Sequence, residues 1–454
     1  MSRNFQDAIT ISRKLGIQYV WIDSLCIIQG DAQDWEIEAA KMASIYNSAY
    51  LVVAATATPD GSGGCLFDRK PHITINGTTS TGTPFEIYGR EKTSHEIFGW
   101  DVDKGLQRVW DPINTQELIN RHLAAYPLMS RAWCFQERML ATRMLHYTKN
   151  EVVFECASSM SCECGALQDH DQDPHLQARR TVLTRPAQVP EKTASPRDHE
   201  DYTEDYKTWR DFMMEFSQKK ITQRADGLPA LAGLAVKWYQ GPSTGRYLAG
   251  MWENDLLRSL AWVSHEEDQG QEHEHNVPSW SWLSAQRGVT WGGNTMRDRE
   301  YFVTINHERT ACRPMTDLNP YGKVSWGHIF MTGRMMPVKI SSINEQRSTV
   351  NLKRDGHSHS ALFKAPDTMH RIRQLKDTQL YCLRFCNFAI SGVHSTDEDS
   401  ALVLAKATAG DLDRQPEHVR TFGNVYVRLG ITIYYPTELW NHDTDSQEVD
   451  LYLI

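Results

Sequence analysis

Long apolar runs and an excess of positive charge are both missing from this chain. No stretch approaches the roughly 18 to 20 apolar residues of a membrane span, and the first residues lack the apolar core of a signal peptide. Lys and Arg total 48 against 57 Asp and Glu, so the formal net charge of −9 offers no general attraction to nucleic acid. We therefore expect a cytoplasmic protein without a membrane span and without a nucleic-acid partner.

The signature motifs of three common enzyme classes lack support in this sequence. The Gly-x-Ser-x-Gly pattern of Gly241 to Gly245 follows a predicted helix rather than a strand, so it is not a nucleophile elbow, and there is no phosphate-binding Gly-x-x-x-x-Gly-Lys and no Gly-x-Gly-x-x-Gly after a strand. Ordinary hydrolase, kinase and dehydrogenase functions therefore lack support. With 454 residues and 40% apolar content, the chain is nevertheless long enough for two or three globular domains.

Cysteine is scattered rather than paired. The nine cysteines are an odd number, and several lie inside apolar runs, which favours reduced, buried thiols over a disulfide framework. One group is denser, with histidines following it: Cys156, Cys162, Cys164, His170 and His175. Thiolates and imidazoles bind zinc, but the paired Cys-x-x-Cys spacing that makes a zinc site a strong prediction is missing. We expect free thiols here and no metal.

The first 165 residues indicate an α/β region. One-sided apolar spacing predicts a helix over residues 4–16, and continuous apolar residues predict a buried strand over 19–22. Asp31 or Asp34 is a reasonable N-cap for the next helix, and a second buried strand is predicted over 50–55. Strand, helix and strand together predict a right-handed parallel crossover.

The rest of the chain divides by composition. Residues 58–127 are rich in turn formers and predict loops and hairpins, followed by a helix over 130–140 and strands over 143–147 and 152–154. The remaining predictions are an acidic mobile linker over 166–205, a helical region over 206–295 and a β-rich module over 296–454. Within the helical region, helices are predicted over 206–220, 228–239 and 247–262.

Several polar side chains lie where α/β proteins usually bind ligands. Asp23 and Ser24 follow the first predicted strand, where they either contact a ligand or cap the following turn. Glu38 lies one turn after Trp35 on the next helix, either as a site residue or as a surface acid, and Glu36 faces elsewhere.

Two further sets of residues allow a structural or a functional interpretation. Arg131, Gln136 and Glu137 are polar residues on an otherwise apolar helix, so they form either a buried ion pair or part of a site. Trp280 and Trp282 either fill a core or line an aromatic pocket. The alternatives remain open from the residues alone.

Two segments closely resemble signature blocks of the fungal heterokaryon incompatibility (HET) domain. They are Trp21 to Gln29 with Asp34, Trp35 and Glu38, and Arg131 to Leu140. Further pieces follow in the order found in long HET-domain proteins: Leu145 to Tyr147, Phe154 to Cys156, Asp226 to Leu234, Tyr247 to Trp252 and Pro278 to Leu283. The resemblance covers roughly residues 5–295. A first family block, an aromatic strand ending in Trp-Gly, is absent, so the α/β region is expected to be N-terminally shortened.

The resemblance implies a fungal protein of non-self recognition and programmed cell death. HET domains are distantly similar to TIR domains, some of which cleave NAD with a helical glutamate near a tryptophan, and the matching residue here is Glu38. The resemblance therefore implies a TIR-like parallel sheet unit with Glu38 as the catalytic residue. The ligand-binding candidates are Asp23, Ser24, Trp35, Arg131, Gln136, Glu137, Trp280 and Trp282. No cofactor is firmly expected, and NAD is a candidate substrate.

Two other functions remain open. The chain has 14 Trp, 17 Tyr and 14 Phe, enough to line a shape-complementary pocket. Such a pocket would suit a cofactor-independent cyclase or isomerase of secondary metabolism that catalyses by positioning its small-molecule ligand. The last alternative is a non-catalytic module that binds a protein partner or a second copy of itself.

Overall fold

The computed structural model divides the chain into two compact units, Met1–Pro186 and Ala187–Ile454, and each is described by itself. The structure describes residues 1–68, 73–89, 124–165, 167, 182–183, 199–239, 241–264, 277–285, 288–291, 300–354, 360–364, 368–387, 399–434, 440 and 446–454. His170 and His175 lie outside these ranges. No helix in this described part is long and apolar enough to cross a membrane.

The first unit opens with three helices, α1 (Arg3–Lys14), α2 (Asp23–Cys26) and α3 (Ala32–Ser48). Helix α1 confirms the predicted N-terminal helix, and Gly16 follows it with a φ of 71°, a conformation that glycine adopts without strain. Helix α3 begins where the sequence predicts, because the Asp31 carboxylate accepts hydrogen bonds from the backbone N–H groups of Gln33 and Asp34.

The strand predicted over residues 19–22 is wrong. The backbone there is not part of a sheet, and Tyr19 is 86% exposed. An apolar run becomes a buried strand only where another strand supplies hydrogen-bond partners, and no described strand pairs with this segment. The expected crossover through residues 19–22 is therefore not formed among the described residues.

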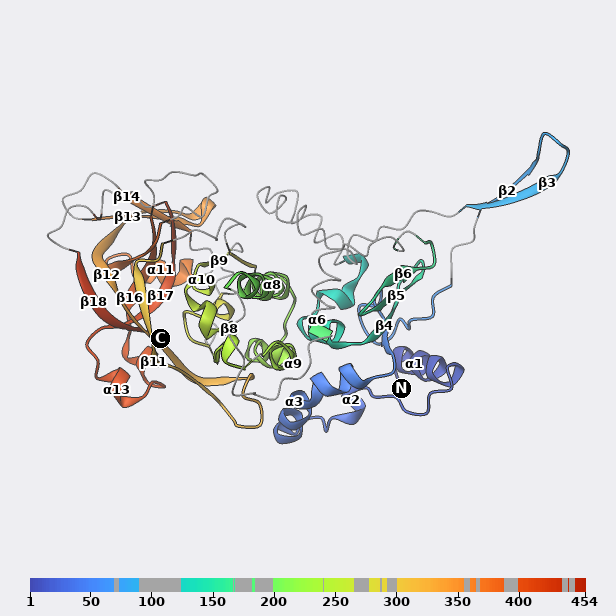
Figure 1. Cartoon of the computed structure of the whole chain (residues 1–454), viewed down its shortest axis with the longest axis horizontal. Coiled ribbons are helices and arrows are strands. Elements are labelled where there is room, and N and C mark those ends of the chain that lie inside the picture. Colours follow the sequence, from blue (N-terminus) through green and yellow to red (C-terminus); the bar gives the residue numbers. More distant parts are fainter. Residues whose placement is uncertain are drawn as a thin grey trace. The chain divides into compact units, whose positions relative to one another are not determined.

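A four-stranded sheet forms the second half of this unit, in the order β1-β4-β5-β6. Strand β1 (Val52–Ala54) pairs in parallel with β4 (Arg143–Tyr147), and antiparallel pairs join β4 to β5 (Val152–Cys156) and β5 to β6 (Met160–Cys162). Figure 1 shows β4, β5 and β6 side by side. The predicted strands are confirmed, and the parallel pair gives the unit its α/β character.

Four further elements belong to the first unit. The hairpin of β2 (Ile73–Thr78) and β3 (Pro84–Gly89) confirms part of the turn-rich prediction. The 3-10 helix η1 (Pro127–Ser130) leads into α6 (Ala132–Leu140), which confirms the helix predicted over 130–140.

A buried ionic group ties α6 to the sheet. The Arg138 guanidinium and the His146 ring both bind one carboxylate oxygen of Glu155, each at 2.9 Å, and Thr56 contacts the other ring nitrogen of His146 at 3.1 Å. All four side chains are buried. Because the positive charge of Arg138 offsets the desolvation of Glu155, the group fastens α6 to strands β4 and β5.

Replacing this carboxylate should weaken the first unit. Glu155→Gln keeps the size of the side chain but leaves the Arg138 charge buried without its counter-ion, and we expect a loss of about 3 to 5 kcal/mol. Amide hydrogen exchange of β4 and β5 in the full chain measures the change in that unit. Glu86→Gln, on the exposed hairpin, is the control and should leave these amides unchanged. Equal exchange in both variants would contradict the role given to Glu155.

The second unit begins with a helical region. Helix α8 (His199–Ser217) starts seven residues before the predicted Tyr206, and α9 (Pro229–Trp238) follows the 3-10 helix η2 (Arg224–Asp226). The other elements are η3 (Gly241–Ser243), β7 (Tyr247–Leu248), β8 (Met251–Trp252), η4 (Glu253–Asp255), α10 (Leu256–Ser259), β9 (Trp262–Ser264), η5 (Trp282–Ser284) and β10 (Val289–Trp291).

The helix predicted over residues 247–262 is wrong at its start. Strands β7 and β8 form a hairpin whose turn holds Ala249 and Gly250 at φ values of 43° and 96°. A right-handed helix cannot continue through two residues with positive φ. Within that range the chain is helical in the 3-10 turn η4 and in the short α10.

The β-rich module predicted after residue 296 is confirmed. Its strands are β11 (Val303–Pro314), β12 (Val324–Asn344), β13 (Thr349–Lys353), β14 (Ser360–Lys364), β15 (Leu380–Cys386), β16 (Ser400–Lys406), β17 (Val425–Tyr434) and β18 (Gln447–Leu453). Short helices interrupt them: η7 (Glu345–Arg347), α11 (Met369–Gln374), α12 (Ala409–Leu412) and α13 (Glu417–Arg420). Pairing of β12 with both β13 and β15 closes the sheet on itself around an apolar core.

Candidate functional site

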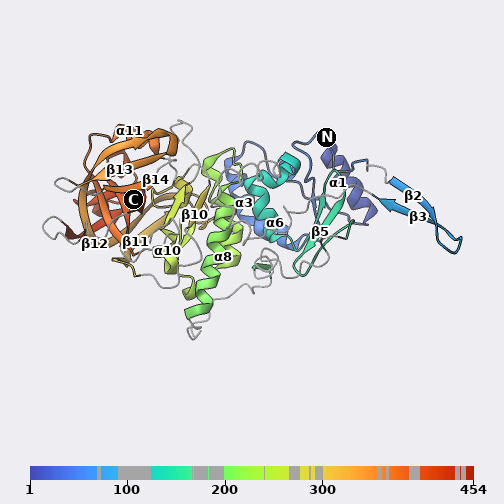
Figure 2. The ribbon, with the colours of Figure 1, turned by 90° about the horizontal axis from the view of Figure 1, so that it is seen from above.

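Helices α3 and α6 lie side by side in the first unit (Figure 2). Trp35 on α3 meets Trp133 on α6 edge to face, with ring centroids 6.2 Å apart. Nearer the end of α3, Tyr46 makes a similar contact with Trp21 at 5.9 Å. Aromatic edges packed this way fix the spacing of the helices and of the segment that precedes α2.

Five polar side chains come together in this helix contact. Glu137 and Cys134 lie one turn apart on α6, and Tyr46 of α3 is hydrogen-bonded to the Glu137 carboxyl group. Asp23 at the start of α2 and Arg131 before α6 supply nearby charges of opposite sign. We call these five residues the Glu137 cluster.

The pKa of Glu137 is raised to about 7. Burial is the largest cause, because a carboxylate loses water that stabilises its charge, and the negative charge of Asp23 adds to the effect. Arg131 and hydrogen bonds from Tyr46 and Cys134 act in the opposite direction but are weaker. Burial also raises the pKa values of Tyr46 and Cys134, with the charge of Glu137 as the next cause.

A carboxyl group with a pKa near neutrality is suited to proton transfer. It exists in both protonation states at physiological pH, which is the condition for efficient general acid or base catalysis. Asp23 is exposed, so water reaches the edge of the cluster, whereas Cys134 is buried behind it. The Glu137 carboxyl group therefore lies at the boundary between the protein core and solvent.

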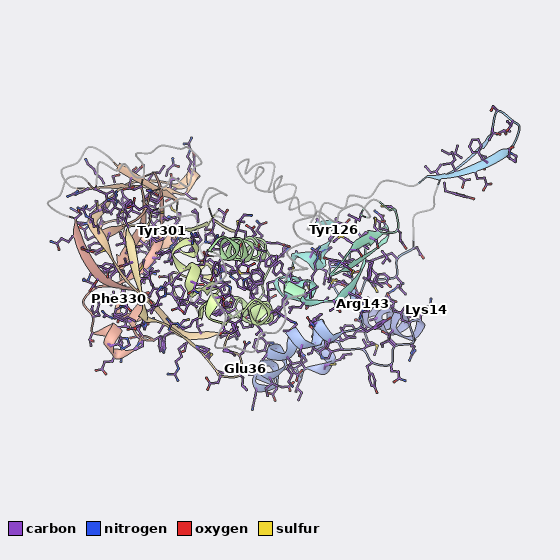
Figure 3. All side chains as sticks on the ribbon, in the orientation of Figure 1. Lys14, Glu36, Tyr126, Arg143, Tyr301 and Phe330 are labelled. Atoms are coloured by element: carbon purple, nitrogen blue, oxygen red, sulfur yellow. The ribbon has the colours of Figure 1, made fainter. Side chains whose placement is uncertain are left out.

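Glu38 has a different environment on the same unit. Its carboxylate pairs with Lys41 one turn later, at 2.7 Å, and its side chain is 18% exposed. Glu36, on the same helix, is labelled in Figure 3. The structure therefore places Glu38 beside a lysine and apart from the Glu137 cluster.

The other residues singled out in the N-terminal sequence fall into separate settings. Ser24 is exposed, and its backbone N–H donates to the Asp23 side chain at 2.7 Å, which is the turn-capping alternative. Arg131 is exposed and Gln136 is fully buried. The buried pairing of arginine with glutamate suggested for this helix is formed instead by Arg138 and Glu155.

Trp280 and Trp282 belong to the second unit, where both are buried. The Trp282 indole N–H donates to the Gly250 carbonyl at 3.2 Å, and the Trp280 carbonyl accepts from Trp262 at 2.9 Å. Ser281, between them, donates to the Ala249 carbonyl. These bonds fasten the Pro-Ser-Trp-Ser-Trp segment to the β7–β8 turn, a packing role.

The sequence patterns single out Glu137 but not two of its neighbours, Tyr46 and Cys134. Cys134 lies three residues before Glu137, a helical spacing that was available as a signal. The approach of Tyr46 depends on how α3 packs against α6, which no local pattern specifies.

Residues 1–137 match the family model of the heterokaryon incompatibility protein (HET). This part of the chain is similar to the HET family. The match includes all of the Glu137 cluster and ends at Glu137 itself. No curated protein and no solved structure gives a significant match. The resemblance to long HET-domain proteins beyond residue 137 stays a prediction.

The raised pKa of Glu137 makes the stability of the first unit depend on pH. A carboxyl group whose pKa is raised from 4.5 to about 7 by folding stabilises the fold below 4.5, and this contribution is lost between 4.5 and 7. Glu137→Gln stays neutral, so its stability relative to the wild type should rise by about 1 to 3 kcal/mol over that interval. Because the Glu137 side chain is partly exposed, this free-energy change is smaller than the full pKa shift would give.

Calorimetry of the full chain at about pH 5 and about pH 8 measures this difference. The exposed Glu86→Gln is again the control and should show no pH-dependent gain. A Glu137→Gln variant whose advantage is the same at both pH values would contradict the raised pKa.

Proposed function

We propose that this protein is a fungal effector of non-self recognition and programmed cell death that cleaves NAD in its HET domain. The HET domain itself suggests a role in heterokaryon incompatibility. The observation that supports catalysis is the Glu137 carboxyl group, which has a pKa of about 7 and lies beside Asp23 and Tyr46. The resemblance to TIR domains supports NAD as the substrate.

Hydrolysis of NAD breaks the bond between the ribose and nicotinamide and adds water to the ribose carbon. Nicotinamide leaves as a neutral base and needs no proton, so the enzyme must stabilise the cationic sugar and activate the water. In this proposal Glu38 supplies the negative charge beside the ribose. Glu137 accepts the proton from the attacking water, and that proton is then released to solvent.

The two carboxylates are suited to different parts of this reaction. Glu38 is paired with a flexible surface lysine, Lys41, which a substrate can displace. Glu137 is held by Tyr46 and has the pKa of an effective base at neutral pH. Trp35, one turn before Glu38, contributes an aromatic surface for a flat ring.

Release of nicotinamide from NAD by the purified full chain tests the proposal. We expect Glu38→Gln and Glu137→Gln each to lower the rate by about 10²- to 10⁴-fold, the usual loss for a charge-stabilising or acid–base group. Glu36→Gln, on the same helix as Glu38, is the matched control and should keep the wild-type rate. No release by the wild type, or full release by Glu38→Gln, would overturn the assignment.

The pH profile separates the role of Glu137 from a purely structural one. A general base must be deprotonated, so the rate should rise through about pH 7 and level off above it, following the pKa of Glu137. Asp23→Asn removes the nearby negative charge and should move this rise to lower pH without abolishing activity. An unchanged profile in Asp23→Asn would exclude Glu137 as the titrating group.

A further inference from the structure

A second group of reactive side chains in the first unit lies beside the turn that joins β4 to β5. The turn between β4 and β5 runs from Thr148 to Glu151, and Thr148 closes it by donating to the Glu151 carbonyl at 2.7 Å. Strand β6 ends at Cys162, and the chain turns back through Cys164 and Gly165. The start of β5 and the end of β6 therefore bring Glu151 beside two cysteines.

The three side chains present their donor atoms to one point. One carboxylate oxygen of Glu151 and the sulfur atoms of Cys162 and Cys164 all lie within 4.8 Å of one another. The two sulfur atoms are 3.2 Å apart, and the backbone N–H of Cys164 donates to Glu151 at 3.1 Å. The hydrogen bond holds the carboxylate in place next to the thiols.

Disulfides and zinc-bound thiolates each have a characteristic distance between their sulfur atoms. A disulfide requires sulfur atoms about 2.05 Å apart, so the observed separation is too long for a disulfide. Two thiolates on one tetrahedral zinc ion lie about 3.8 Å apart, because each Zn–S bond is about 2.3 Å long. A shift of roughly 0.6 Å, within the reach of one side-chain rotation, therefore converts the cluster into a zinc-binding geometry.

We propose that Glu151, Cys162 and Cys164 bind one zinc ion. Two thiolates and one carboxylate are donors that zinc accepts, whereas a purely oxygen-based site would favour magnesium or calcium. Glu151 is fully buried and Cys162 is nearly so, and a buried carboxylate next to thiolates gains most from a divalent cation. Cys164 is exposed, which gives the ion a route from solvent.

The position of the site gives the ion a structural role. Cys162 contributes to the small core that also contains Tyr126, Met129 and Val153. Figure 3 labels Tyr126, whose pKa is raised by burial and by the charge of Glu151. An ion held here joins the start of β5 to the end of β6 and neutralises the charge of Glu151 at the same time. The inference does not depend on NAD cleavage.

Metal analysis of the full chain, purified under reducing conditions, tests the proposal. We expect about one zinc per wild-type chain. Cys164→Ser should lose most of it without unfolding, because its side chain is exposed. Glu151→Gln keeps the hydrogen bond from the Cys164 backbone but removes the charge, and it should also lose the ion. Cys156→Ser is the matched control, since Cys156 lies at the far end of β5 and contacts Ser158 and Ser159 instead.

Titration of the metal-free protein with Co²⁺ adds a spectroscopic readout. A tetrahedral site with two thiolates should give the sulfur-to-cobalt charge-transfer and strong visible bands of such a centre, and zinc should displace them. The proposal fails if the wild type binds neither Zn²⁺ nor Co²⁺, or if Cys164→Ser retains full zinc. It also fails if the purified protein contains no metal and mass spectrometry finds a disulfide between Cys162 and Cys164.

Discussion

The burial of one carboxyl group between two helices is the constraint on which the N-terminal unit depends. Glu137 lies where α3 meets α6, partly removed from water and close to the negative charge of Asp23. A carboxylate in such a place costs free energy, so the helices pack most favourably when the group is protonated. Helix packing and the protonation of Glu137 are therefore coupled, and a ligand that contacts one of them also changes the other.

A second buried carboxyl group in the same unit shows how neighbours decide the outcome. Glu155 is as deeply buried as any group in the sheet, yet Arg138 and His146 both contact it. Through these contacts Glu155 joins α6 to strands β4 and β5. Glu137 has the acid Asp23 nearby and the exposed Arg131 as a weaker counter-charge, so its pKa is raised to about 7. Two glutamates in one unit thus reach different chemistry because their neighbours differ.

Local patterns predicted the elements that depend on local chemistry. Asp31 caps α3 as expected because an N-cap needs only its own side chain and the N–H groups two and three residues later. The strand over 19–22 failed because its partner is a tertiary property, and the helix over 247–262 failed because its turn needs positive φ at Ala249, a residue that gives no such signal. Glu137 was recognisable as a polar residue on an apolar helix, but Asp23 and Tyr46, which act on its pKa, come from distant segments.

Strand β12 has the most far-reaching consequence for the second unit. Its residues, Val324–Asn344, are hydrogen-bonded in turn to β11, β13, β15 and β18, so one continuous backbone sets the register of four neighbours. A strand shared in this way cannot be divided between two independent folding steps. The module should therefore lose its structure in one cooperative event. Insertions should therefore be tolerated only in the connections between strands, where they leave β12 unchanged.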